Sequence, residues 1–235
     1  MRRVREPELM DDPALPEEEH AAALHSLARA SRRLGIDWNL RRAFGEVTAG
    51  SAVSVLDIGT GAGGLLDRIA RRSVASSDGR ELHGGAAHLL GMDISERAVR
   101  MARSWQHPQI TWVCGDALRL PFADRSCDIV TCSLMLHHFD PPDVERILRE
   151  VARVCRHGVV ISDLTRSRLA LAVTWLTTRM VSRSRVFRVD GPRSVRAAYR
   201  PAEMLELAHR AGLAGAATRR QFPFRMLLIW KKGAQ

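Results

Sequence analysis

The sequence predicts a doubly wound α/β fold, in which a mostly parallel sheet of seven strands ends in an antiparallel hairpin. The chain has 235 residues, 46% of them hydrophobic, which suits one domain with a full core. From Ala52 onward, short apolar runs alternate with segments of helical spacing, and strands separated by helices pair in parallel. The last two runs are joined through Phe222-Pro223-Phe224 without a helix, so they form the hairpin.

Before the sheet, the pattern predicts one or two helices. Glu17, Glu18 and Glu19 follow Pro16 and suit the first turn of a helix, and apolar residues then recur at helical spacing as far as Ile36. We interpret residues 1–50 as a helical segment that covers the binding site, and residues 51–235 as the main domain.

The remaining elements follow in order along the chain. Predicted strands span residues 53–58, 88–93, 110–114, 127–133, 159–163, 214–222 and 225–232, and predicted helices span 65–72, 96–103, 144–155 and 201–211. Residues 73–85, rich in serine, aspartate, glycine and histidine, predict a loop. Residues 164–189 are apolar early and arginine-rich later, which predicts a helical insertion after the fifth strand and a lid that extends to about residue 200.

A glycine-rich turn follows the first strand, in Val55-Leu-Asp-Ile-Gly-Thr-Gly-Ala-Gly-Gly64. Glycines at such a turn let the backbone approach a ligand, and the start of the next helix offers free N–H groups. Gly59, Gly61 and Gly64 also satisfy a dinucleotide-binding pattern. Asp57 discriminates between a dinucleotide and a ligand with an ammonium group, because its carboxylate would repel the pyrophosphate of the first and attract the ammonium of the second. S-adenosylmethionine (SAM) carries an ammonium on its methionine end, so the turn favours SAM over NAD.

Two further acids follow the next strands. Asp93 ends the second strand, where a carboxylate can accept hydrogen bonds from both ribose hydroxyls, although NAD enzymes place an acid there too. Asp116 follows the third strand and can accept a hydrogen bond from the adenine amino group, while Ile94 and Ala117 can sandwich the ring. Each acid alone could be a cap or turn residue, but the ordered set favours a SAM site.

The candidate catalytic residues are His137 and His138, which follow the fourth strand at the edge where open α/β folds bind ligands. A histidine of near-neutral pKa can take a proton from a phenol or enol; alternatively, it orients the loop or touches the cofactor. Asp163, at the end of the fifth strand, either orients the substrate or caps the next helix. Tyr199 is a candidate for contact with the substrate only because of its position before the helix that begins at Pro201.

Over roughly residues 52–230 the chain resembles the class I SAM-dependent methyltransferases, which have a Rossmann-like fold. The resemblance rests on Leu56-Asp-Ile-Gly-Thr-Gly-Ala-Gly63, Met92-Asp-Ile-Ser95, Gly115-Asp-Ala-Leu118 and Cys127-Asp-Ile-Val130. Leu136-His-His-Phe139 and the run from Asp116 to Asp124 are similar to ubiquinone/menaquinone-biosynthesis methyltransferases. Residues 12–40, 162–167 and 190–195 resemble a bacterial subgroup encoded near polyketide synthases.

This resemblance implies site residues and a reaction. SAM would contact Asp57, Gly59, Thr60, Gly61, Asp93, Asp116 and Ser133, and the family's Leu-His pair aligns on His137, which places it ahead of His138. A substrate oxygen or carbon would attack the methyl group in line, and S-adenosylhomocysteine would leave. The protein would mainly supply proximity and alignment. The acceptor would be small and hydrophobic or aromatic, because the predicted lid carries Leu169, Leu171, Val173, Trp175, Leu176 and Met180.

Charge and composition restrict the partners. The net charge of +10 comes mainly from arginines spread along the chain, some of them in pairs, and aromatic residues are only 5%, so binding to nucleic acid is disfavoured. An RNA or DNA methyltransferase and a non-catalytic SAM-binding partner protein remain alternatives. We expect no metal site, because the chain has no CxxC pair and no evident ligand cluster. We also expect a cytoplasmic monomer or homodimer, since there is no apolar run of membrane-spanning length and no secretory signal.

Overall fold

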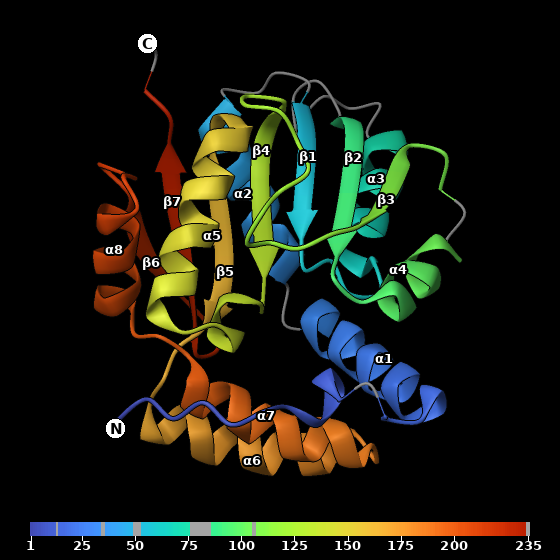
Figure 1. The fold of residues 1–235 in the computed structure, drawn as a ribbon. Helices are drawn as coiled ribbons and strands as arrows, with labels where there is room; N and C mark the ends of the chain where they lie inside the picture. The colour runs from blue at the N-terminus through green and yellow to red at the C-terminus, as the bar shows by residue number, and fades with distance from the viewer. Residues whose placement is uncertain (13, 34–35, 49–52, 76–85, 105–106, 234–235) are drawn as a thin grey trace.

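The computed structural model describes residues 1–12, 14–33, 36–48, 53–75, 86–104 and 107–233. In this part of the chain, seven strands form one sheet in the order β3-β2-β1-β4-β5-β7-β6 (Figure 1). The strands are β1 Val53–Ile58, β2 Ala86–Asp93, β3 Ile110–Cys114, β4 Cys127–Ser133, β5 Cys155–Leu164, β6 Ala217–Gln221 and β7 Arg225–Lys231. Strands β1 to β5 pair in parallel, and β7 runs antiparallel to both β5 and β6. The predicted fold class is confirmed.

Eight helices surround the described part of the sheet. They are α1 Glu17–Arg33, α2 Ile36–Thr48, α3 Gly64–Ala75, α4 Glu96–Arg103, α5 Pro141–Val154, α6 Arg168–Val181, α7 Arg185–Ala197 and α8 Pro201–Arg210. Short 3₁₀ turns occur at Leu9–Asp11 and Leu136–His138. None of the helices in the described residues is long and apolar enough to cross a bilayer.

Each face of the sheet buries its own apolar cluster. On one face, Leu40 and Phe44 of α2 and Leu66 of α3 pack against alternate strand residues such as Val55 and Ile129. On the other face, residues of α5 and α8 pack against the neighbouring strand positions, which include Leu56 and Val130. The alternation along each strand places successive side chains on opposite faces, as a sheet covered on both sides requires.

Two local contacts help to fix the register of the sheet. Gly91 of β2 lies opposite Trp112 of β3, and a Cβ atom at Gly91 would approach the indole Cζ3 atom to 2.3 Å, so the glycine makes room for the ring. Asp128 of β4 accepts hydrogen bonds from the backbone N–H and the hydroxyl of Ser54, at 2.8 and 2.9 Å. Burial would raise the pKa of Asp128, but these bonds and the nearby Arg156 outweigh burial and lower it.

Most predicted boundaries agree with the structure, and the largest differences surround β5. The helix predicted over 144–155 begins earlier, at Pro141, because proline suits the first turn of a helix. The strand predicted over 159–163 spans Cys155–Leu164, since exposed Arg156 and His157 interrupt the apolar pattern without ending the strand. Residues 76–85 of the predicted loop and the boundary at residues 50–51 lie outside the described residues.

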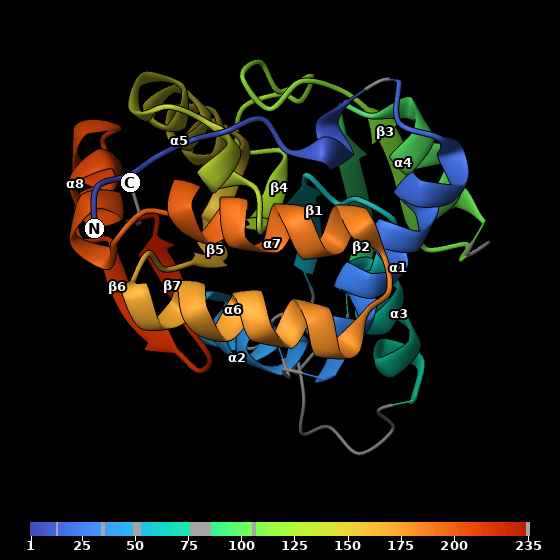
Figure 2. The ribbon, with the colours of Figure 1, turned by 90° about the horizontal axis from the view of Figure 1, so that it is seen from below.

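The predicted insertion after β5 consists of the two packed helices α6 and α7. They lie across the carboxyl ends of the parallel strands, together with residues 1–12, which we call the N-terminal segment (Figures 1 and 2). Helix α7 extends past the predicted end, through Pro192 to Ala197, because Pro192 removes only its own backbone donor. The fold thus places two separate parts of the chain, the insertion and the N-terminal segment, over one edge of the sheet.

Candidate functional site

A cavity of about 1180 Å³ lies between the carboxyl edge of the sheet and these covering segments. Its volume exceeds the roughly 300–1000 Å³ of most ligand pockets, which leaves room for two small molecules side by side. The ends of β1 to β4 form one wall, and residues of α1, α6, α7 and the N-terminal segment form the other. The residues predicted to bind the cofactor all line it: Asp57, Gly59, Thr60, Gly61, Asp93, Ile94, Asp116, Ala117 and Ser133.

The turn after β1 is shaped for close approach to a ligand. Gly59 and Gly61 have φ angles of +67° and +54°, which an L side chain rarely adopts. A Cβ atom on Gly59 would also lie 2.8 Å from the sulfur of Met135. Asp57, only 2% exposed, accepts a hydrogen bond of 2.9 Å from the Thr60 hydroxyl, so its carboxylate is fixed at the mouth of the turn.

Asp93 joins this turn to the next strand. One carboxylate oxygen accepts the Gly61 N–H at 2.8 Å, and the other accepts the Ser95 N–H at 2.9 Å. Asp116 is held in the same way, by the Leu118 N–H at 2.8 Å. Three hydrogen-bond-accepting carboxylates thus stand in the order that an ammonium, a ribose diol and an adenine amino group need, so this set of acceptors fits SAM.

His137 and His138 line the same cavity. His137 is 2% exposed, and its Nδ1 atom lies 2.7 Å from a carboxylate oxygen of Asp163, whose other oxygen accepts the His137 backbone N–H at 3.1 Å. Burial would lower the pKa of His137, but the charge and hydrogen bonds of Asp163 and Glu8 raise it to about 10. In this arrangement the imidazole is protonated at neutral pH, so the predicted role as a base requires it to lose that proton first.

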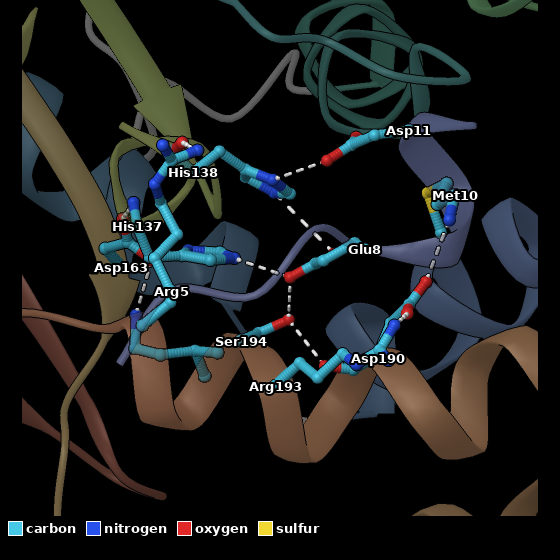
Figure 3. A network of polar contacts seen from close by, with 12 residues as sticks. Arg5, Glu8, Met10, Asp11, His137, His138, Asp163, Asp190, Arg193 and Ser194 are labelled. Atoms are coloured by element: carbon cyan, nitrogen blue, oxygen red, sulfur yellow. Dashed lines mark hydrogen bonds and ion pairs between the residues drawn. The ribbon is translucent and has the colours of Figure 1, made fainter. Parts of the chain in front are cut away.

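Glu8 completes this cluster and was not predicted. Its carboxylate faces both rings, with Oε1 3.6 Å from Nε2 of His137 and Oε2 3.8 Å from Nε2 of His138 (Figure 3). The Ser194 hydroxyl of α7 also donates a hydrogen bond to Oε1. Burial would raise the pKa of Glu8, but the hydrogen bond with His137 and the charges of both histidines lower it. Nothing in the local sequence pattern around Glu8 signals this contact, which joins residues far apart in the chain.

The N-terminal segment that carries Glu8 is tied to α7 by its backbone. The buried carboxylate of Asp190 accepts the N–H groups of Leu9 and Met10, at 2.8 and 3.0 Å (Figure 3). Arg193 donates to the carbonyl oxygen of Pro7 at 2.9 Å. These bonds hold the residues on both sides of Glu8, so its position is determined by α7.

The two predicted substrate residues, Asp163 and Tyr199, are not among the described residues that line the cavity. Asp163 is buried behind His137 and also accepts the Leu164 N–H at 2.7 Å, and the cap of α6 is Ser167 and not Asp163. Tyr199 donates its hydroxyl hydrogen to the Phe139 carbonyl at 2.8 Å, with the Arg3 guanidinium 4.3 Å from the ring centroid. Asp163 is therefore a positioning residue for His137, and Tyr199 is part of the packing.

The predicted apolar roof also needs correction. Of the six α6 residues that suggested it, only Val173 lines the cavity, while Leu169, Trp175, Leu176 and Met180 are between 51% and 76% exposed. Since α6 lies on the surface, its apolar residues divide between two sides. The apolar wall of the cavity comes instead from several elements, and it includes Leu24, Leu27, Phe139, Val173, Val181, Phe187 and Phe224.

Comparison with known proteins identifies the domain. Residues 55–158 match the family model described as "Methyltransferase domain". Over these residues the chain is similar to methyltransferase domains, and its fold is that of the class I methyltransferases. The match covers the strands and turns that bear Asp57, Asp93 and Asp116, the acids predicted to bind the cofactor.

Individual relatives share part of this methyltransferase domain. The biotin biosynthesis bifunctional protein BioHC of Cellvibrio japonicus is 35% identical over 105 residues, which are 44% of this chain and 18% of that protein. The demethylmenaquinone methyltransferase of Corynebacterium kroppenstedtii is 38% identical over 78 residues, 33% of this chain and 32% of that protein. The matches thus span less than half the length of these curated relatives.

A solved structure extends the likeness to the whole fold. The plantazolicin methyltransferase BamL, in complex with a triazolic desmethylPZN analog and S-adenosylhomocysteine, superimposes with a TM-score of 0.63 at 15% identity. The superposition covers 92% of this chain and 98% of that one. The N-terminal helices and the insertion after β5 therefore belong to the shared fold, and the cofactor of this methyltransferase class is SAM.

Proposed function

We propose that the protein transfers the methyl group of SAM to an oxygen or carbon atom of a small hydrophobic or aromatic acceptor. The observation that carries this proposal is that the three strand-end carboxylates and the His137–His138 pair line one cavity. A methyl donor on the carboxylates would thus share an enclosed space with an acceptor near the histidines.

SAM supplies an electrophilic methyl carbon on its sulfonium and leaves as S-adenosylhomocysteine. Asp57 would hold the ammonium of its methionine end, Asp93 the ribose and Asp116 the adenine amino group, with Ile94 and Ala117 beside the ring. Fixing both reactants in line is the main contribution of the chain, because the donor is already activated. His137 and His138 would meet the reacting atom of the acceptor, with His137 held in place by Asp163.

The apolar lining supports a hydrophobic acceptor. Phe139, Val181, Phe187 and Phe224 offer ring and methyl surfaces on the side of the cavity that the strand-end carboxylates do not occupy. We also propose that residues 1–50 and the insertion at about 164–200 act as a lid over this side. The named activity of the demethylmenaquinone relative makes quinol-like and phenolic acceptors a reasonable first set to test.

The test combines binding with product analysis. The protein is incubated with SAM that carries a deuterated methyl group, together with naphthoquinols, phenols and β-keto esters, and the products are weighed by mass spectrometry. We expect one labelled methyl group on an acceptor of this kind, and a lower turnover number at unchanged SAM affinity in His137→Asn. Methylation of RNA, DNA or hydrophilic acceptors alone would overturn the proposed acceptor class, and binding of SAM without any transfer would leave a binding protein.

A further inference from the structure

The two histidines form a cluster with Glu8, to which the proposed methyl transfer assigns no role. Each of the three residues offers one ligand atom, a ring nitrogen or a carboxylate oxygen, and these three atoms all lie within 4.8 Å of one another. Both Nε2 atoms face the same carboxylate, one toward each of its oxygens (Figure 3). The separations of 3.6 and 3.8 Å are close to the roughly 3.4 Å edge of a tetrahedron of ligands around zinc, so small side-chain movements would place all three on one ion.

The other nitrogen of each ring is already held. Nδ1 of His137 lies 2.7 Å from Asp163, and Nδ1 of His138 lies 3.2 Å from Asp11. Metal-binding histidines usually donate their second N–H to a carboxylate, which fixes the tautomer and turns the free nitrogen to the metal. Here both rings have that support, and it comes from two different parts of the chain.

The charge around the cluster also suits a cation. Each of the carboxylates of Glu8, Asp11 and Asp163 contacts at least one of the two rings. Three acidic groups thus surround two imidazoles, which are neutral when they bind a metal. Arg3 and Arg5 donate hydrogen bonds to the backbone carbonyl oxygens of His137 and His138, not to the rings, and the charge of each is paired with Asp140. With nitrogen donors in the majority, the set favours zinc-like ions over magnesium or calcium, which prefer oxygen.

We propose that Glu8, His137 and His138 bind one divalent transition-metal ion of the zinc type, with an open position toward the cavity that takes an oxygen atom of the acceptor. Two histidines, one glutamate and a free position are the arrangement of catalytic zinc sites. The three residues line the cavity, so the free position faces the space assigned to the acceptor. The ion would lower the pKa of the bound hydroxyl, so its proton would be released to water and the oxygen would attack the methyl carbon as an oxyanion. This last step rests on the proposed function, whereas metal binding does not.

Binding is measured on the full chain without a histidine tag, in a Cys114→Ser background, because the thiol of Cys114 is exposed and can itself bind zinc. After treatment with a chelator, the protein is titrated with Zn²⁺ by calorimetry and with Co²⁺ by visible absorption. We expect one saturable site, the strong visible bands of four- or five-coordinate cobalt, and no comparable binding of Mg²⁺. Absence of a saturable Zn²⁺ or Co²⁺ site would overturn the proposal and leave the cluster as an ion pair.

Variants locate the site. Glu8→Gln and His138→Ala should weaken binding by more than the roughly 10–100-fold expected for an outer-shell change, and Asp11→Asn should weaken it by about 10-fold. His137→Ala is less informative because this ring is buried against Asp163. The matched control is His209→Ala, an exposed histidine of α8 outside the cavity, which should bind as the parent does. Unchanged affinity in Glu8→Gln and His138→Ala would place the metal elsewhere and refute the site.

SAM affinity, measured on the same samples, separates the two proposals. If SAM binds and methyl transfer occurs without any metal site, only the metal proposal fails. If the metal binds to these three residues and no acceptor is methylated, the site stands and the proposed function fails.

Discussion

Replacement of Asp57 by asparagine tests the electrostatic basis of cofactor binding. The two side chains have the same shape, and the amide oxygen can still accept the Thr60 hydroxyl, so the turn should keep its conformation. What is lost is the negative charge opposite the ammonium of SAM. A hydrogen bond to a charged group contributes about 1.5–3 kcal/mol, which corresponds to an increase in Kd of about 10- to 150-fold. Since Asp57 is only 2% exposed, water cannot replace the charge, and we expect the upper half of that range.

The assay compares two ligands on the same variant. SAM and 5′-methylthioadenosine share the ribose and the adenine, but methylthioadenosine lacks the amino-acid tail. Calorimetric titration should show a large loss of affinity for SAM and little change for methylthioadenosine. An equal loss for both ligands would show that the substitution had disturbed the turn, and an unchanged affinity for SAM would refute the assigned role of Asp57.

Three further changes test the fold and the covering segment. Gly91→Ala should lower the free energy of unfolding by about 1–3 kcal/mol in urea titrations, because the added methyl group overlaps Trp112; an unchanged midpoint would contradict this packing. Asp190→Ala should speed amide exchange at Leu9 by about tenfold, since the backbone N–H loses its acceptor; equal exchange rates would show that other bonds hold the N-terminal segment. Asp128→Asn should lower the free energy of unfolding by an amount that is constant above about pH 5 and disappears in acid. The pKa of Asp128 is lowered in the folded protein, so this carboxylate stabilises the fold only while it is charged. A difference in stability that persisted at low pH would contradict this.

The fold was predictable because its pattern is local. β1, β3 and β4 were predicted with their observed bounds, since each is a compact apolar run beside a turn. β5 was predicted too short, because the partners of Arg156 and His157 on neighbouring strands cannot be inferred from polarity. The apolar residues of α6 predicted a roof, but a helix with apolar residues on several sides does not reveal which side faces inward.

The candidate site was predictable where it follows the strands. Asp57, Asp93 and Asp116 come at the ends of consecutive parallel strands, so topology alone brings them together. Glu8 was missed because its approach to His137 depends on how the N-terminal segment crosses α7, and no periodicity along the chain encodes that path. For the same reason the sequence suggested no metal site, although both histidines were identified.

The bond from Ser194 to Glu8 spans 186 positions, which has a consequence for biosynthesis. Once the ribosome has made the chain as far as Ser133, β1 to β4 can already pair and present the three acidic strand ends. The opening residues must wait, because their anchor on α7 emerges only near the end of translation, and closing so long a loop is slow. A nascent chain stalled before α7 would therefore have its cofactor pocket open on one side. The carboxylate of Glu8 would take its place beside the two histidines only after α7 had emerged.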